Sequence, residues 1–166
     1  MYRLAICDDT ERDAEHLHLL CARFKGKSNL SITVFLTGAD LLAAHSKEAF
    51  DIILLDVDMP HTNGLQIGKV LHKASPQTII IFVTSYPQYA IEAYDCEAFH
   101  YLLKPCDEHK LFQVLNRAIG KLKLTMKFHL IKTQKKALKL RISDIYYVEC
   151  CRKHIIYHTK TTAMIP

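Results

Sequence analysis

Glycine and proline are scarce in this sequence of 166 residues, which contains five of each. With 49% hydrophobic and 23% charged residues, that scarcity argues against a collagenous, low-complexity or disordered chain. Long apolar runs are also missing: the longest, around residues 79–83, is too short to span a bilayer. Asp8 and Asp9 interrupt the N-terminal apolar stretch, so it does not have the pattern of a secretory signal. We therefore expect a globular cytoplasmic protein without membrane association, whose six cysteines are reduced thiols.

Acidic residues are almost absent from the C-terminal part. Residues 121–166 contain 11 Lys and Arg but only 2 Asp and Glu, whereas residues 1–120 contain 11 and 15. The overall charge of +5 therefore combines a net −4 with a net +9. This division predicts two parts with different partners, and the basic part suits a surface that faces phosphates.

Short apolar segments alternate with helical patterns through the first 122 residues. Strands that are apolar on both faces and alternate with helices indicate a parallel sheet covered on both sides. Five such units predict an α/β doubly wound fold of the flavodoxin type. Thr10 is predicted to cap the first helix, with Asp13 three residues later completing the cap. The predicted strands are 3–7, 32–35, 52–55, 78–83 and 100–103, and the clearest later helix is 107–121.

The pattern changes after Lys123. Four short strand-like runs follow without an intervening helix, at 128–133, 137–141, 145–149 and 154–158. About 40 residues can scarcely form a core of their own. We therefore predict a first domain over residues 1–122, and over 123–166 a basic linker and an incomplete all-β segment that begins a second domain.

A polar side chain follows each of four predicted strands. Because the carboxyl ends of parallel strands meet at one edge of a sheet, we expect these side chains to lie together. No requirement of core packing explains their choice. They are Asp8 and Asp9 after the first strand, Asp56 after the third, Thr84 after the fourth and Lys104 after the fifth.

Three neighbouring carboxylates repel one another by roughly a few kcal/mol, so they need a compensating cation. Mg²⁺ suits them because it prefers oxygen ligands and retains some water. The expected ligands are the side chains of Asp9 and Asp56, Asp8 directly or through water, and the backbone carbonyl of Asp58. These residues predict a magnesium site.

The same edge also suits phosphoryl chemistry. Asp56 can attack phosphorus and form an acyl phosphate, which is a known form of carboxylate nucleophilic catalysis. Lys104 would neutralise a phosphoryl oxygen, and Thr84 would donate a hydrogen bond to another.

Five segments in order carry a family resemblance. They are Asp8-Asp9, ILLDVDMP around Asp56 with Pro60 and Gly64 beyond it, Thr84-Ser85, Tyr101 and Lys104-Pro105. With these segments, residues 1 to about 122 closely resemble the CheY-like receiver domain of two-component response regulators.

The resemblance implies a role for each matching residue. Asp56 would accept a phosphoryl group from a sensor histidine kinase, with Mg²⁺ held by Asp8 and Asp9. Thr84 and Lys104 would bind the phosphoryl group, and Tyr101 would be the aromatic switch that changes dimerisation. Lys104-Pro105 would be a cis bond. Such a protein is no enzyme beyond its own phosphorylation and dephosphorylation.

The stretch LKLRISDIYYVECCRKHIIYHT more loosely resembles the start of a LytTR-type DNA-binding domain. This resemblance implies that the full-length protein regulates transcription at promoter DNA. The strands that contact bases would lie beyond Pro166, so we do not expect this chain alone to bind promoters.

Three other interpretations remain open. The receiver could act through protein–protein contacts alone. Asp56-Val57-Asp58 is also similar to the motif of aspartate-nucleophile phosphohydrolases, although Pro60 stands where those enzymes have Thr or Val. Finally, a zinc site could form from Cys150, Cys151, His154 and His158, but strands around a hairpin explain the same pattern.

Overall fold

The computed structural model describes residues 1–25, 29–60, 62–94, 96–125, 128–132, 137–151 and 154–159. The chain divides into two compact units, Met1–Ala118 and Ile119–Pro166. Among the described residues, no helix combines the length and the apolar character needed to cross a membrane.

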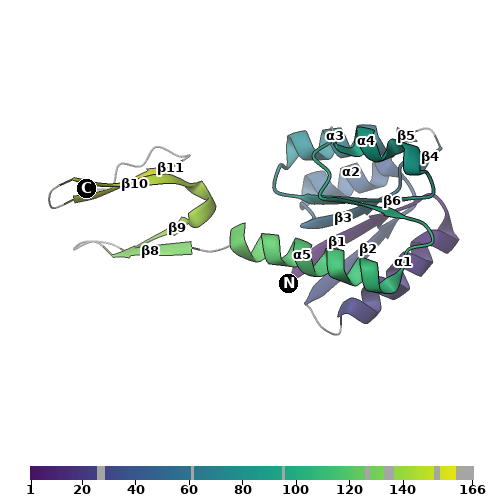
Figure 1. Cartoon of the computed structure of the whole chain (residues 1–166), viewed down its shortest axis with the longest axis horizontal. Helices are drawn as coiled ribbons and strands as arrows, with labels where there is room; N and C mark the ends of the chain where they lie inside the picture. Colours follow the sequence, from purple (N-terminus) through teal and green to yellow (C-terminus); the bar gives the residue numbers. More distant parts are fainter. Residues whose placement is uncertain are drawn as a thin grey trace. The chain divides into compact units, whose positions relative to one another are not determined.

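The first unit contains a five-stranded parallel sheet with the strand order β2-β1-β3-β6-β7 (Figure 1). Every residue of β3 and β6 is buried, which explains why their sequences are apolar on both faces. The predicted doubly wound parallel sheet is therefore confirmed. The strands are β1 (Tyr2–Cys7), β2 (Leu30–Phe35), β3 (Ile52–Leu55), β6 (Ile79–Thr84) and β7 (His100–Leu103).

Helices cover both faces of this sheet. Figure 1 shows α2, α3 and α4 on one face and α1 and α5 on the other. This arrangement buries the apolar sides of strands and helices together, as expected for a doubly wound fold. The helices are α1 (Glu11–Lys25), α2 (Gly38–Lys47), α3 (Gly64–Ala74), α4 (Ala90–Tyr94) and α5 (Glu108–Thr125).

Three short elements lie in connections where no strand or helix was predicted. β4 (Asp58–Met59) pairs antiparallel with β5 (Thr62–Asn63), and the 3₁₀-helix η1 (Pro87–Tyr89) precedes α4. Elements of two or three residues are too short to show a hydrophobic period in the sequence. The two connections directly follow Asp56 and Thr84, which are two of the predicted site residues.

The cysteines of the first unit are buried free thiols: Cys7, Cys21, Cys96 and Cys106. Burial, reinforced by the nearby Asp8 carboxylate, raises the pKa of Cys7 to about 12. Such a thiol is not reactive at neutral pH, because the thiolate is the nucleophilic form. Cys7 is therefore a core residue.

The second unit contains two antiparallel hairpins after the end of α5. β8 (Phe128–Lys132) pairs with β9 (Ala137–Arg141), and β10 (Ile145–Cys151) pairs with β11 (His154–Thr159), with η2 (Ile142–Asp144) between β9 and β10. All four predicted strands are present. The predicted domain boundary after residue 122 falls inside α5, so that boundary stays a prediction.

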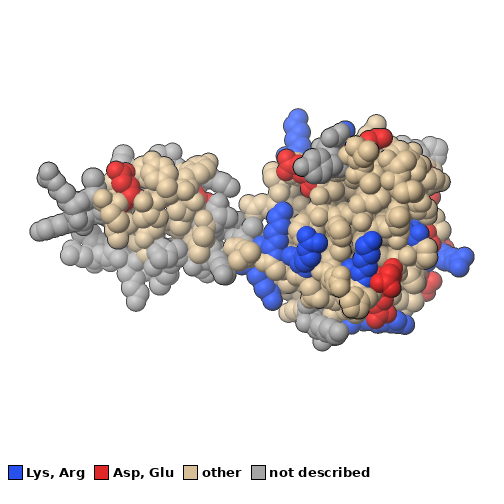
Figure 2. Space-filling view, in the orientation of Figure 1, with Lys and Arg blue, Asp and Glu red and all other residues tan. Residues whose placement is uncertain are grey.

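Charged side chains of both signs lie on the visible face of the first unit. Figure 2 shows Lys and Arg over the region of α5, with Asp and Glu beside them. No single sign of charge covers this face.

Candidate functional site

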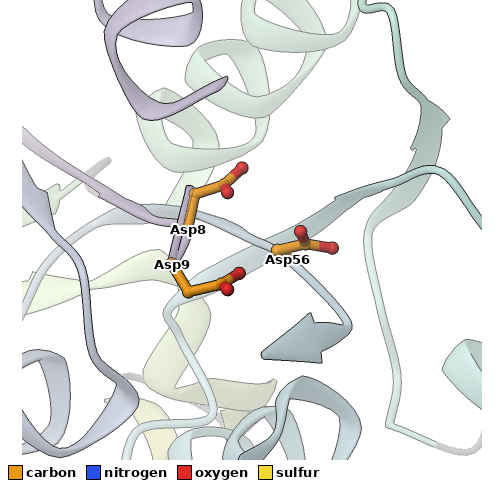
Figure 3. A group of neighbouring side chains, drawn as sticks. All are labelled: Asp8, Asp9 and Asp56. Atoms are coloured by element: carbon orange, nitrogen blue, oxygen red, sulfur yellow. The ribbon is translucent and has the colours of Figure 1, made fainter. Parts of the chain in front are cut away.

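Three carboxylates gather at the carboxyl edge of the sheet. Asp8, Asp9 and Asp56 each bring an oxygen within 4.8 Å of the other two (Figure 3). β1 and β3 are neighbours, with Cys7 opposite Leu55, so the residues that follow these strands emerge side by side. The predicted convergence is confirmed for these three residues.

Backbone hydrogen bonds fix the Asp56 carboxylate. Its Oδ1 accepts hydrogen bonds from the N–H groups of Val57 at 2.6 Å and Asp58 at 3.3 Å. The Asp56 N–H donates to the carbonyl of Cys7 at 2.9 Å, which continues the β1–β3 pairing past the end of the strand. One carboxylate oxygen is thus held by the backbone, while the other, Oδ2, faces Lys104.

Gly64 allows α3 to begin directly beside Asp56. Its N–H donates to the carbonyl of Val57 at 2.8 Å. A Cβ atom at this position would lie 1.9 Å from the carbonyl oxygen of Asp56. Only a residue without a side chain fits there, which gives the Gly64 of the family motif a physical reason.

Lys104 is held among three carboxylates. Its Nζ lies 2.7 Å from Asp8 Oδ2, 2.7 Å from Asp56 Oδ2 and 2.9 Å from Asp13 Oδ2. Burial lowers the pKa of Lys104, but its hydrogen bonds to Asp56, Asp8 and Asp13 outweigh that effect and raise the pKa above its usual value. Burial raises the pKa of Asp8, a carboxyl that shares one ammonium with two others. The Lys104-Pro105 bond is cis, as expected.

Asp13 is a member of this cluster that the sequence pattern did not indicate. It was predicted to complete the cap of the first helix, but the Thr10 N–H donates to Asp8 Oδ1 at 3.1 Å. The carboxylate of Asp13 contacts Lys104 instead. No spacing rule connects a residue of α1 with the residue that follows β7, so only the folded chain shows the contact.

Thr84 contributes an unsatisfied hydroxyl at the same edge. It is the last residue of β6 and is 0% exposed, and its Oγ1 has no hydrogen-bond partner among the described residues. An unpaired buried hydroxyl costs about 1–3 kcal/mol. A ligand oxygen that accepts this hydrogen bond would recover that energy.

Tyr101 is tied to the connection after Thr84. Its hydroxyl donates to the backbone carbonyl of Tyr86, and its ring centroid lies 6.4 Å from that of Phe82. The predicted switch residue therefore contacts the segment that begins two residues beyond Thr84.

The donor set fits a hard divalent cation. Asp8, Asp9 and Asp56 form the only group of three or more potential metal ligands among the described residues. Carboxylate oxygens at this spacing are the ligands that Mg²⁺ prefers. The role of the Asp58 carbonyl stays a prediction. Of the alternative zinc ligands, the side chains of Cys151 and His154 lie outside the described part of the chain.

Comparison with known families agrees with this geometry. Residues 4–116 match the family model described as the response regulator receiver domain. The chain belongs to this family. The matched range contains every residue of the acidic cluster, together with Thr84, Tyr101 and Lys104.

Several curated response regulators are similar in sequence. The chain is 35% identical over 118 residues to a response regulatory protein of Yersinia pestis, covering 70% of this chain and 48% of that protein. It is 33% identical to the transcriptional regulatory protein BtsR of Salmonella typhi, with the same coverage. It is also 37% identical over 78 residues to the sensory transduction protein LytT of Bacillus anthracis, covering 47% of this chain and 32% of LytT. The chain thus spans about half the length, or less, of these relatives.

Solved receiver structures share the fold. The REC domain of AraT, a response regulator from Geobacillus stearothermophilus, has a TM-score of 0.68 and 26% identity, covering 76% of this chain and 98% of that one. The BeF3-activated DrrB receiver domain has a TM-score of 0.64 and 24% identity, covering 72% and 98%.

Proposed function

We propose that Asp56 accepts a phosphoryl group from a sensor histidine kinase and that the chain is a phosphorylation-dependent switch. The observation that carries this proposal is the pairing of the Asp56 carboxylate with Lys104 at 2.7 Å, beside the unsatisfied hydroxyl of Thr84. This arrangement offers a nucleophile, a cation and a hydrogen-bond donor. Together they match the needs of a transferred phosphoryl group.

In the transfer step, a carboxylate oxygen of Asp56 attacks phosphorus, and the bond between phosphorus and the donor nitrogen of the kinase histidine breaks. The nitrogen keeps the bonding electron pair, and because the other ring nitrogen of the phosphorylated histidine carries a proton, the imidazole leaves in its neutral form. The product on Asp56 is an acyl phosphate. Lys104 and Thr84 each donate a hydrogen bond to phosphoryl oxygens, which stabilises the charge that collects on them.

Asp8, Asp9, Asp56 and the carbonyl of Asp58 would hold Mg²⁺. When bound, the ion neutralises charge on the acidic cluster and on phosphoryl oxygens. Asp9 is the least buried of the three carboxylates. Among the described residues, the ion pairs of Lys104 are with Asp8, Asp13 and Asp56 and not with Asp9. We therefore assign Asp9 mainly to the metal.

The switch is a population shift that begins at Thr84 and Lys104. When these side chains turn toward the phosphoryl group, the connection after β6 moves, and Tyr101 moves with it through Tyr86. The surface of α4, β7 and α5 then changes and supports homodimerisation. Ile91 and Leu103 already expose 82% and 45% of their surface there.

For the full-length protein we propose regulation of transcription in the cytoplasm through a LytTR-type DNA-binding domain. Support comes from the basic composition of residues 121–166, from the strand pairs β8–β9 and β10–β11, and from similarity to proteins named as transcriptional and sensory transduction regulators. Salt-dependent promoter binding by the longer gene product, absent from residues 1–122, is the expected result. Phosphorylation-dependent effects without DNA binding would instead favour a receiver that acts through protein contacts.

Labelling with acetyl phosphate and Mg²⁺ tests the acceptor. We expect the label to saturate near one phosphoryl group per chain, to be released by hydroxylamine and to disappear in Asp56→Asn. Asp58→Asn is the matched control because it removes a neighbouring carboxylate but keeps the backbone carbonyl, so labelling should persist. Undiminished labelling of Asp56→Asn contradicts the proposal, and continuous turnover of acetyl phosphate would favour the phosphohydrolase.

A further inference from the structure

One of the three carboxylates that Lys104 contacts does not belong to the predicted acceptor site. Asp8 and Asp56 come from the strand ends, whereas Asp13 lies in the first turn of α1, with its Oδ2 2.9 Å from Nζ. An ammonium group has three N–H donors, and the three carboxylates match that number. We propose that Asp13 is a positioning residue, which holds the Lys104 ammonium toward α1 until a phosphoryl group on Asp56 draws it away. This inference rests on the proposed function.

Burial decides which of the three contacts gives way. The side chains of Asp8 and Asp56 are 1% and 8% exposed, whereas that of Asp13 is 39% exposed. Breaking a buried ion pair leaves an uncompensated charge in a medium of low dielectric constant, which is strongly unfavourable. An exposed carboxylate is solvated by water when its partner leaves, so its ion pair is weak. Asp13 therefore releases Lys104 first, and the freed N–H is available to a phosphoryl oxygen.

The charge of Asp13 acts in opposite directions on the two expected ligands. With Asp13, this edge holds four carboxylates and one ammonium that contacts three of them, so the site carries an excess of negative charge. That excess attracts a divalent cation and repels an anion. Asp13 also occupies a donor of Lys104 that an anion would need. Asp13 thus favours Mg²⁺ and opposes the phosphoryl group, which makes it a brake on activation.

Asp13→Asn in the 166-residue chain tests this assignment. Calorimetry would give the dissociation constants of Mg²⁺ alone and of beryllofluoride at saturating Mg²⁺. Beryllofluoride is the activating group named for the DrrB receiver, to which this fold is similar. We expect Mg²⁺ to bind about two- to fivefold more weakly and beryllofluoride about three- to tenfold more tightly. Asp13→Glu, which restores the charge, should return both constants toward those of the unmodified chain.

Glu11→Gln is the matched control. Glu11 is exposed and belongs to the same first turn of α1 as Asp13. Glu11→Gln therefore removes one negative charge and its favourable interaction with the helix dipole, as Asp13→Asn does. It is not among the carboxylates that contact Lys104. We expect changes below about twofold for both ligands.

Three results would overturn the assignment of Asp13. In the first, Asp13→Asn weakens the binding of both Mg²⁺ and beryllofluoride, as a purely structural role requires. In the second, Asp13→Asn changes both dissociation constants as little as Glu11→Gln does. In the third, Asp13→Glu does not restore the constants of the unmodified chain. The proposed function fails in a different way: the unmodified chain would then bind no beryllofluoride and take no label on Asp56.

Discussion

Tyr101 donates its hydroxyl hydrogen bond to the backbone carbonyl of Tyr86, so the second residue of β7 is joined to the connection between β6 and α4. A hydrogen bond to the Asp58 carboxylate raises the pKa of Tyr86, and its ring lies edge-on to that of Tyr89 at 6.1 Å. Tyr86 therefore links the segment after Asp56 with the predicted switch residue. We therefore expect a movement at either end to be transmitted through this residue.

Tyr101→Phe removes that link while keeping the aromatic ring. We expect the free energy of unfolding to fall by about 0.5–1.5 kcal/mol, the usual value of one hydrogen bond. Amide hydrogen exchange of residues 85–90 should become faster, while phosphoryl labelling of Asp56 remains. Tyr89→Phe is the control, since it removes a neighbouring hydroxyl but keeps the Tyr101–Tyr86 contact. Unchanged exchange in Tyr101→Phe would mean that the hydrogen bond does not order this connection.

Gly64→Ala should be strongly destabilising. The added Cβ would lie 1.9 Å from the Asp56 carbonyl oxygen and 2.9 Å from Val57 Cα, and both are backbone atoms that cannot move aside locally. We expect a loss of about 3 kcal/mol or more in urea unfolding, together with impaired labelling, because α3 must shift away from Asp56.

Gly120→Ala provides the opposite case in the same experiment. Apart from its chain neighbours and the backbone of its own helix, no atom of the described residues lies within 4 Å of its added Cβ, and the position is inside α5. Alanine is the better helix former, so a gain of about 0.5–1 kcal/mol is expected. If the two substitutions changed the free energy of unfolding equally, the short distance from position 64 to the Asp56 carbonyl would not be what restricts this position to glycine.

Stability should decrease in mildly acidic solution because of His45. This side chain is 5% exposed, its Nδ1 accepts from the Phe50 N–H at 3.2 Å, and its Nε2 lies 3.0 Å from Ser75 Oγ. Burial, reinforced by Arg3, lowers the pKa of His45 below the ordinary 6.5. As the pH falls, His45 therefore takes up a proton in the unfolded chain at a higher pH than in the folded chain. The contribution of neutral His45 to the free energy of unfolding is complete above pH 6.5 and is lost as the pH falls toward the lowered pKa.

Urea unfolding of the unmodified chain and of His45→Gln between pH 7.5 and pH 5 would check this sign. The difference between their free energies of unfolding should shrink on acidification, with a slope of at most about 1.4 kcal/mol per pH unit. His16→Gln, at an exposed position of α1, is the matched control. A difference that is constant across this range would show that the His45 pKa is the same in both states.

Lys104→Ala should make stability depend on Mg²⁺. Without the ammonium, Asp8 and Asp56 are buried charges with no cation, and the expected loss in a chelator is about 2–4 kcal/mol. Added Mg²⁺ should restore most of this loss and should bind more tightly than in the unmodified chain, because no ammonium competes for the same oxygens. Thermal unfolding with and without Mg²⁺ measures both effects, and Lys110→Ala is the control. Weaker Mg²⁺ binding by Lys104→Ala would contradict the assignment of Asp8 and Asp56 to the metal.

Much of the site could be predicted because it follows from connectivity. Parallel strands present their carboxyl ends at one edge, so the positions of Asp8, Asp56, Thr84 and Lys104 in the sequence already imply their convergence. The two-residue strands β4 and β5 could not be predicted, since so short a segment has no period to detect. The hydrogen bond between Tyr101 and Tyr86 likewise depends on how a loop packs, which local sequence does not specify.

The sequence by itself indicated the family through the resemblance of its motif segments. It also determined the parallel sheet and the residues at its edge, because the succession of apolar strands and helices is a pattern along the chain. Only the tertiary structure decided that Asp13 belongs with Lys104 and that the buried hydroxyl of Thr84 has no hydrogen-bond partner among the described residues. It likewise decided that Gly64 lies against the carbonyl of Asp56. These relationships depend on how α1, β6 and α3 pack against segments distant in sequence. Packing fixes interatomic distances to fractions of an ångström, and no spacing along the chain contains that information.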